Sequence, residues 1–162
     1  MALITPFDDF PIHQTAETLA VPSSSDRNHY DRYWFNGFSE EKDFLFEIGV
    51  GFYPNRHIMD AHFSISTAGK QYSYHASTRM NPARYPINIG PISLEILEPM
   101  QKIRFSLKDP EKKLSCDLIF NAITEPHLEP KSLMIEGTRK ILETSRFTQF
   151  GKWDGSIETE SG

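Results

Sequence analysis

Apolar and more polar residues alternate along most of the chain after residue 30. The clearest segment is 44–52, where Phe44, Phe46, Ile48, Val50 and Phe52 occupy every second position. The same alternation recurs at 59–65, 92–96, 103–107 and 114–122. A period of two places alternate side chains on one face of an extended strand. The pattern therefore predicts a succession of strands with one buried face each.

Turn-forming residues separate these segments. Short runs rich in Pro, Asn, Asp or Gly occur at 53–56, 67–70 and 109–113, and Glu-Pro pairs end two of the predicted strands. Further strand candidates cover 137–150 and 153–159. A helix over 132–144 is the alternative for part of that region, but its apolar residues have poor helical spacing and Gly137 interrupts them.

The order of these elements predicts the fold class. About eight short strands joined by tight turns, without helical segments between them, favour an all-β, antiparallel architecture. We expect either a closed barrel or a strongly curved sandwich, and a barrel of eight strands would have room for one small ligand. Residues 1–28 contain three prolines and no sustained period, so we interpret them as an N-terminal arm and residues 29–162 as the β-domain.

Composition narrows the function classes. The 162 residues include twelve Phe, six Tyr and two Trp, which suits strands with large buried side chains. The formal net charge of −5 and the absence of basic runs argue against nucleic-acid binding. No apolar stretch approaches the ~20 residues that a membrane-spanning helix needs. The single cysteine, Cys116, and an N-terminus unlike a signal peptide favour a cytoplasmic location.

Asp60 and His62 are the first candidates for catalysis. They are two residues apart in a predicted strand, so their side chains leave the same face. We expect the carboxylate to raise the pKa of the imidazole and orient it, which suits general acid–base chemistry. His75, in the next predicted strand, is expected within reach, and three such groups are also a possible metal set. The alternative is that these residues form an ordinary solvated face. They would line an interior cavity only if Met59 and the alternate residues after it point outwards.

Five other residues are candidates for ligand contact. Trp34 and Asn36 lie in an aromatic strand, which favours an apolar ligand held by one orienting hydrogen bond, or else a packed core with a bulge. Arg146 is a candidate for binding a ligand carboxylate, or for capping an aromatic ring at one end of a barrel. Tyr53 and Gln149 complete the set. No phosphate-binding loop, nucleophile elbow or metal-spaced Cys/His motif is present, so we expect no cofactor and no metal.

Several segments resemble a group of bacterial proteins with a lipocalin-like fold. The matching stretches include Asp-Asp-Phe-Pro-Ile-His-Gln at 8–14, Tyr-Asp-Arg-Tyr-Trp-Phe-Asn-Gly within 25–37, Gly-Phe-Tyr-Pro-Asn-Arg at 51–56 and Arg-Phe-Thr-Gln-Phe-Gly-Lys-Trp at 146–153. Shorter matches occur at 59–61, 90–92 and 97–99. That group is similar, more distantly, to the AttH-type proteins and the carotenoid hydratases, which consist of two lipocalin-like β-domains.

The resemblance implies that this chain corresponds to the first of the two domains. It further implies binding of a hydrophobic small molecule, such as a terpenoid, steroid or lipid-like compound, in a β-barrel cavity, with hydration, dehydration or isomerisation of a lyase type as the possible reaction. The alternative function is a non-catalytic β-domain that packs on a second lipocalin-like domain or forms a homodimer. Whether the chain is an enzyme stays open at this point.

Overall fold

The computed structural model describes residues 15–41, 43–111 and 113–160, and in these ranges the regular structure is almost entirely strand. One 3-10 turn (Pro54–Arg56) connects two strands. The strands are β1 (Asp31–Phe38), β2 (Phe44–Tyr53), β3 (Ile58–Thr67), β4 (Lys70–Arg79), β5 (Ile87–Ile89), β6 (Ile92–Glu98), β7 (Lys102–Lys108), β8 (Leu114–Ala122), β9 (His127–Leu128), β10 (Ser132–Glu136), β11 (Arg139–Thr144), β12 (Phe147–Thr148) and β13 (Gly151–Thr159). The all-β prediction is confirmed.

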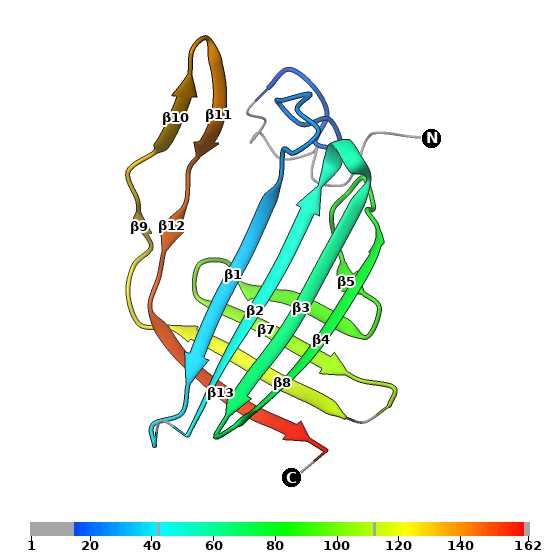
Figure 1. Ribbon diagram of the computed structural model, residues 1–162, viewed down its shortest axis with the longest axis vertical. Helices are drawn as coiled ribbons and strands as arrows, with labels where there is room; N and C mark the ends of the chain where they lie inside the picture. Colours follow the sequence, from blue (N-terminus) through cyan, green and yellow to red (C-terminus); the bar gives the residue numbers. More distant parts are fainter. Residues whose placement is uncertain (1–14, 42, 112, 161–162) are drawn as a thin grey trace.

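Two antiparallel sheets form the body of the protein. The first has the strand order β1-β2-β3-β4, and the second has the order β13-β8-β7-β6-β5. Figure 1 shows the strands of the second sheet running across those of the first. Two short ribbons, β9 with β12 and β10 with β11, connect β8 to β13 and project from this body.

The two sheets do not close into a barrel. In the described ranges, the backbone ladders end at β1 and β4 in one sheet and at β13 and β5 in the other. Side chains rather than hydrogen-bonded strands close the sides between the sheets. Of the two expected architectures, the curved sandwich is therefore the one that forms, and the closed barrel was wrong.

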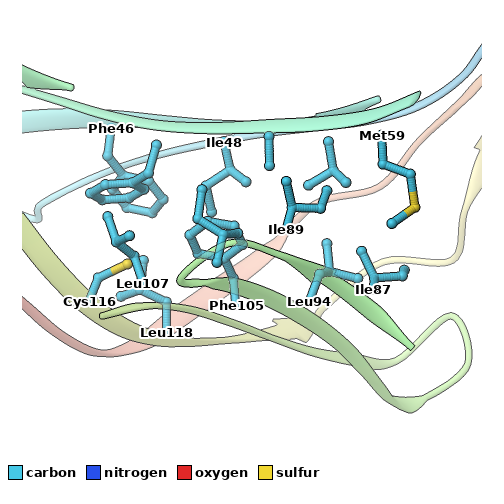
Figure 2. Packing of buried hydrophobic residues seen from close by; sticks show 14 of the residues in the cluster. Phe46, Ile48, Met59, Ile87, Ile89, Leu94, Phe105, Leu107, Cys116 and Leu118 are labelled. Atoms are coloured by element: carbon cyan, nitrogen blue, oxygen red, sulfur yellow. The ribbon is translucent and has the colours of Figure 1, made fainter. Parts of the chain in front are cut away.

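Alternate residues of β2 and β3 fill the space between the sheets. Ile48, Val50 and Phe63 are fully buried, and the ring of Phe63 stacks on that of Phe105 from β7 with centroids 5.9 Å apart. Figure 2 shows side chains of the first sheet pointing towards those of the second. The described interior is thus packed with side chains, in keeping with the close packing of protein cores.

This packing determines which alternate residues of β3 face the interior. Met59, Ala61, Phe63 and Ile65 are between 0% and 3% exposed, and they belong to the core. Because side chains alternate along a strand, Asp60 and its neighbours of the same parity face the other way. The condition under which they would line an interior cavity is therefore not met.

An aromatic cluster closes the side between β1 and β13. The indole of Trp153 packs edge-on against Phe46 and Phe35, with ring centroids 5.5 and 5.7 Å away, and lies 5.3 Å from Phe120. Its Nε1 donates a hydrogen bond of 3.1 Å to the carbonyl of Asn36. Trp153 thus links the two sheets by packing and by one directional bond.

The N-terminal arm is fixed to the end of the first sheet by the turn after β2. The side-chain amide of Asn55 donates to the carbonyls of Ser24 and Asp26, and Arg56 donates to the carbonyl of Arg27. These three contacts are hydrogen bonds to the backbone of the arm. The short turn at 54–56 is what supplies them.

The helix alternative for 132–144 was wrong, since β10 and β11 form a hairpin there. Gly137 adopts a positive φ of 58° in its turn, which glycine reaches without strain. Cys116 is buried, as expected for a core residue, and burial raises the pKa of its thiol to about 12. None of the helical structure in the described ranges has the length and apolar character for crossing a bilayer.

The aromatic cluster predicts unequal roles for the two tryptophans. Trp153→Ala should lower the free energy of unfolding by about 3 kcal/mol, because large aromatic truncations in packed sites cost that much. Trp153→Phe keeps most of the packing and should lose about 1 kcal/mol, the value of one hydrogen bond. Trp34→Ala, at a side chain that is 55% exposed, should change stability by no more than about 0.5 kcal/mol. Urea denaturation of the three variants measures this, and equal losses for the two alanine variants would contradict it.

Candidate functional site

The outer face of the first sheet carries polar side chains in cross-strand rows. One row aligns Arg32 of β1, Gly51 of β2, Asp60 of β3 and Ser77 of β4. The adjacent row aligns Trp34, Gly49, His62 and His75 in the same strand order. Strand pairing therefore places Asp60, His62, His75 and Trp34 on one face, as close neighbours.

Two glycines of β2 create space on this face. A Cβ atom at Gly49 would lie 2.3 Å from Cε1 of His62, and one at Gly51 would lie 2.8 Å from the hydroxyl of Tyr53 and 2.7 Å from Oδ1 of Asp60. Any larger residue at either position would displace these groups. The glycines thus let the imidazole and the phenol lie flat against the sheet.

The result is a shallow hollow of about 380 Å³ on the outer face. It is open to solvent and mostly polar. Its side chains with functional groups are Arg32, Tyr53, Asp60, His62, His75 and Ser77. The volume is in the range of small-molecule sites.

His62 is a half-buried imidazole between groups of opposite charge. Its Nε2 lies 3.7 Å from Oε1 of Glu47, and its ring centroid lies 5.6 Å from that of His75. Burial lowers the pKa of His62, the nearby Glu47 carboxylate opposes this, and His75 and Arg32 lower the pKa further. Because the net direction is downward, the imidazole is neutral at neutral pH and can accept a proton.

Tyr53 and Asp60 form a second pair in the hollow. The Tyr53 hydroxyl donates a hydrogen bond to the Asp60 carboxylate, and its pKa is raised by burial and then by that carboxylate. We expected Asp60 to hold and activate His62. In the structure Asp60 has Tyr53 as its hydrogen-bond partner, and Glu47 is the carboxylate with the larger influence on the imidazole pKa.

Arg32 is the cation of the site. Its side chain is exposed and has no hydrogen bond or ion pair with any residue in the described ranges. Its charge nevertheless reaches the hollow, since it partly opposes the rise in the pKa of Tyr53 and contributes to the lowered pKa of His62. A guanidinium at the edge of a polar hollow can bind a carboxylate or phosphate group of a ligand.

The structure separates the other predicted residues. Asn36 is one row beyond His62, opposite Glu47, and its carbonyl accepts the bond from Trp153. Arg146 and Gln149 lie in the segment that connects β8 to β13, on either side of β12. Arg146 forms an ion pair with Glu129 instead of capping an aromatic ring, and the Gln149 amide donates to the carbonyls of Met100 and Thr124.

Our reading of the sequence missed five residues of this face: Arg32, Glu47, Gly49, Gly51 and Ser77. Arg32 was not among the candidate residues, and the glycines were taken only as the more polar positions of the alternation at 44–52. Their signal was the alternation itself, because two glycines on one face of a strand leave a gap beside Asp60 and His62. Among the described residues, no group of three or more His, Cys, Asp or Glu side chains is arranged to hold a metal ion.

Comparison with known protein families places the chain in one of them. A family of unknown function, DUF8625, matches residues 4–162, so the chain belongs to that family. No curated protein and no solved structure matches the chain.

The contact between Gly49 and His62 gives a direct test of the site geometry. Gly49→Ala should push the imidazole away from the sheet, since its Cβ would meet the movable end of that side chain. The loss of burial should move the pKa of His62 upward towards its ordinary value, which an NMR titration of the ring protons measures.

Gly51→Ala is the matched control. Its Cβ would meet Tyr53 and Asp60 instead of the imidazole, so the His62 titration should shift less than in Gly49→Ala. An unchanged His62 titration in Gly49→Ala would show that this glycine does not set the position of the ring.

Proposed function

We propose that this chain binds a small molecule with an anionic group and an apolar or planar part on the outer face of the first sheet, and that His62 exchanges a proton with it. The observation that carries the proposal is the guanidinium of Arg32, which has no ion pair with any residue that the structure describes, beside a neutral imidazole and the Tyr53–Asp60 pair. These groups line one hollow.

The binding roles follow from the positions of the side chains. Arg32 offers a planar pair of donors, which matches the geometry of a carboxylate or phosphate. Trp34 lies next to Arg32 on the same face of β1 and exposes its indole, so it can receive an apolar or planar part of the same ligand. Together they favour an amphipathic acid.

The chemistry assigned to the hollow is general acid–base catalysis. His62 is neutral, so it can remove a proton from carbon or from a water molecule. The Tyr53 hydroxyl keeps its proton at neutral pH, and after turning away from Asp60 it can pass that proton to a leaving oxygen. In a dehydration these two transfers release water and form a double bond, and hydration is the reverse.

The resemblance to the carotenoid hydratases supports this reaction class and a lipocalin-like relationship for the fold. A terpenoid, steroid or lipid-like substrate fits the proposal where it carries an acidic group. The apolar part would then rest on Trp34 at the surface of the sheet, because the space between the two sheets is occupied by side chains.

Arg32 should discriminate between acids and their esters. We expect aromatic and terpenoid carboxylic acids to shift the amide resonances of β1 to β4, and their methyl esters to bind about tenfold more weakly, because a hydrogen bond to a charged group is worth roughly 1.5–3 kcal/mol. Arg32→Gln should remove the preference for the acid.

Arg104→Gln is the matched control, because Arg104 is exposed on the second sheet and paired with Asp117. This variant should bind the same acids as the unchanged chain. Acids and esters that bind equally to the unchanged chain would exclude the assigned role of Arg32.

Anion binding should also depend on pH. As the pH falls, protonation of His62 adds a second cation beside Arg32, so affinity for a carboxylic acid with a low pKa should rise. Since the pKa of His62 is lowered from 6.5, the rise should occur below that pH. His62→Asn should flatten the profile measured by calorimetry, while His75→Asn separates the contribution of the neighbouring ring. A profile that stays unchanged in His62→Asn would contradict the assignment.

A further inference from the structure

The segment 123–150, here called the ribbon, extends away from the two-sheet body. Its strands pair as β9 with β12 and β10 with β11, and the amides of Ile123 and Thr124 bond to the carbonyl of Phe150 at its base. Figure 1 shows it as the yellow-to-orange hairpin beside the first sheet. The site described above uses none of its residues.

The ribbon exposes many large apolar side chains. Those that are 38–70% exposed are Ile123, Leu128, Leu133, Met134, Ile135, Ile141, Leu142, Phe147 and Phe150. An isolated two-stranded ribbon is at best marginally stable in water, so packing on another surface has to supply the missing stability. Exposed apolar clusters of this kind mark interaction sites.

Both faces of the ribbon take part in this exposure. Met134 and Leu142 are direct cross-strand partners on one face, as are Leu128 and Phe147 nearer the base. Leu133 lies on the face opposite to Met134, because adjacent residues of a strand point to opposite sides. A partner must therefore cover the ribbon from two sides.

We propose that the ribbon is the surface through which two copies of this chain associate. With about half of a side-chain surface of roughly 150–200 Å² exposed at each of nine positions, the ribbon offers on the order of 800 Å². This is the area that one partner contributes to a stable interface of standard size, about 800 Å².

The charge of the ribbon favours a second copy as the occupant. The ribbon contains four Lys or Arg and four Glu residues, whereas the whole chain has a formal net charge of −5. Ion pairs inside the ribbon use Lys131 and Lys140 with Glu143, and Arg146 with Glu129. Two ribbons can therefore meet without net repulsion, while the rest of the chain carries the excess negative charge.

A two-fold symmetric dimer can also cover both faces of each ribbon. Each ribbon can meet the other ribbon on one face and the body of the other copy on the opposite face. Such an interface is isologous, so every apolar residue of the ribbon contributes twice. The association is independent of the proposed function, because none of the site residues lies in the ribbon.

Sedimentation velocity of the full chain over about 1–100 µM tests the proposal, since a standard interface can reach dissociation constants in or below this range. We expect a dimer, and we expect the double variant Met134→Glu, Phe147→Glu to be monomeric, with a dissociation constant raised at least tenfold. Both positions are exposed, and a cooperative thermal transition shows that the variant folds. Leu45→Glu is the matched control, because Leu45 is 53% exposed in β2, against 55% for Met134, and should stay dimeric.

Spin labels give a second measurement that does not need the double variant. Cys116 is buried and its thiol pKa is raised to about 12, so a cysteine introduced on the surface is labelled selectively. Labels on Ser132→Cys in the ribbon should show a shorter distance between copies than labels on Ser156→Cys in β13. A monomer at all concentrations, or a dimer that is unaffected by the ribbon variants and brings Ser156 closer than Ser132, overturns the proposal.

Discussion

Burial of alternate side chains of β2 and β3 against the second sheet is the constraint from which the rest of the structure follows. Phe63 meets Phe105 across the interface, and Ile48 and Val50 are completely enclosed between the sheets. Because the period of a strand is two, this choice of parity assigns every remaining residue of both strands to the outer face. A slip of one residue would bury Asp60 and His62 without partners, which is strongly unfavourable.

The same choice of buried residues determines which side chains lie on the outer face of the first sheet. Gly49 and Gly51 contribute nothing to the core, and their effect is the space in which His62 and Tyr53 lie flat. This placement gives the imidazole enough burial to lower its pKa while Glu47 stays within 3.7 Å. An otherwise ordinary solvated sheet face thus gains a hollow with a proton acceptor, a proton donor and the cation of Arg32.

The body and the ribbon differ in how their apolar side chains are covered. In the body, Trp153 closes the side between β1 and β13, so the apolar interior is sealed without additional backbone pairing. The ribbon has no second layer in the described part of the chain, and large apolar residues such as Leu128 and Phe147 stay exposed. The contrast is the physical basis for assigning recognition of another chain to the ribbon and ligand chemistry to the first sheet.

The sequence by itself determined the all-β class, the position of most strands and the shared face of Asp60 and His62. Those features depend on local alternation and turn residues, which can be recognised in the sequence without knowledge of the fold. Only the tertiary structure decided that the sheets stay open at their edges, that Tyr53 rather than His62 bonds to Asp60, and that Arg146 lies outside the site. These outcomes depend on contacts between residues that are far apart in the sequence. Alternation shows that a strand has an apolar and a polar face, but it does not show which other element packs against each face.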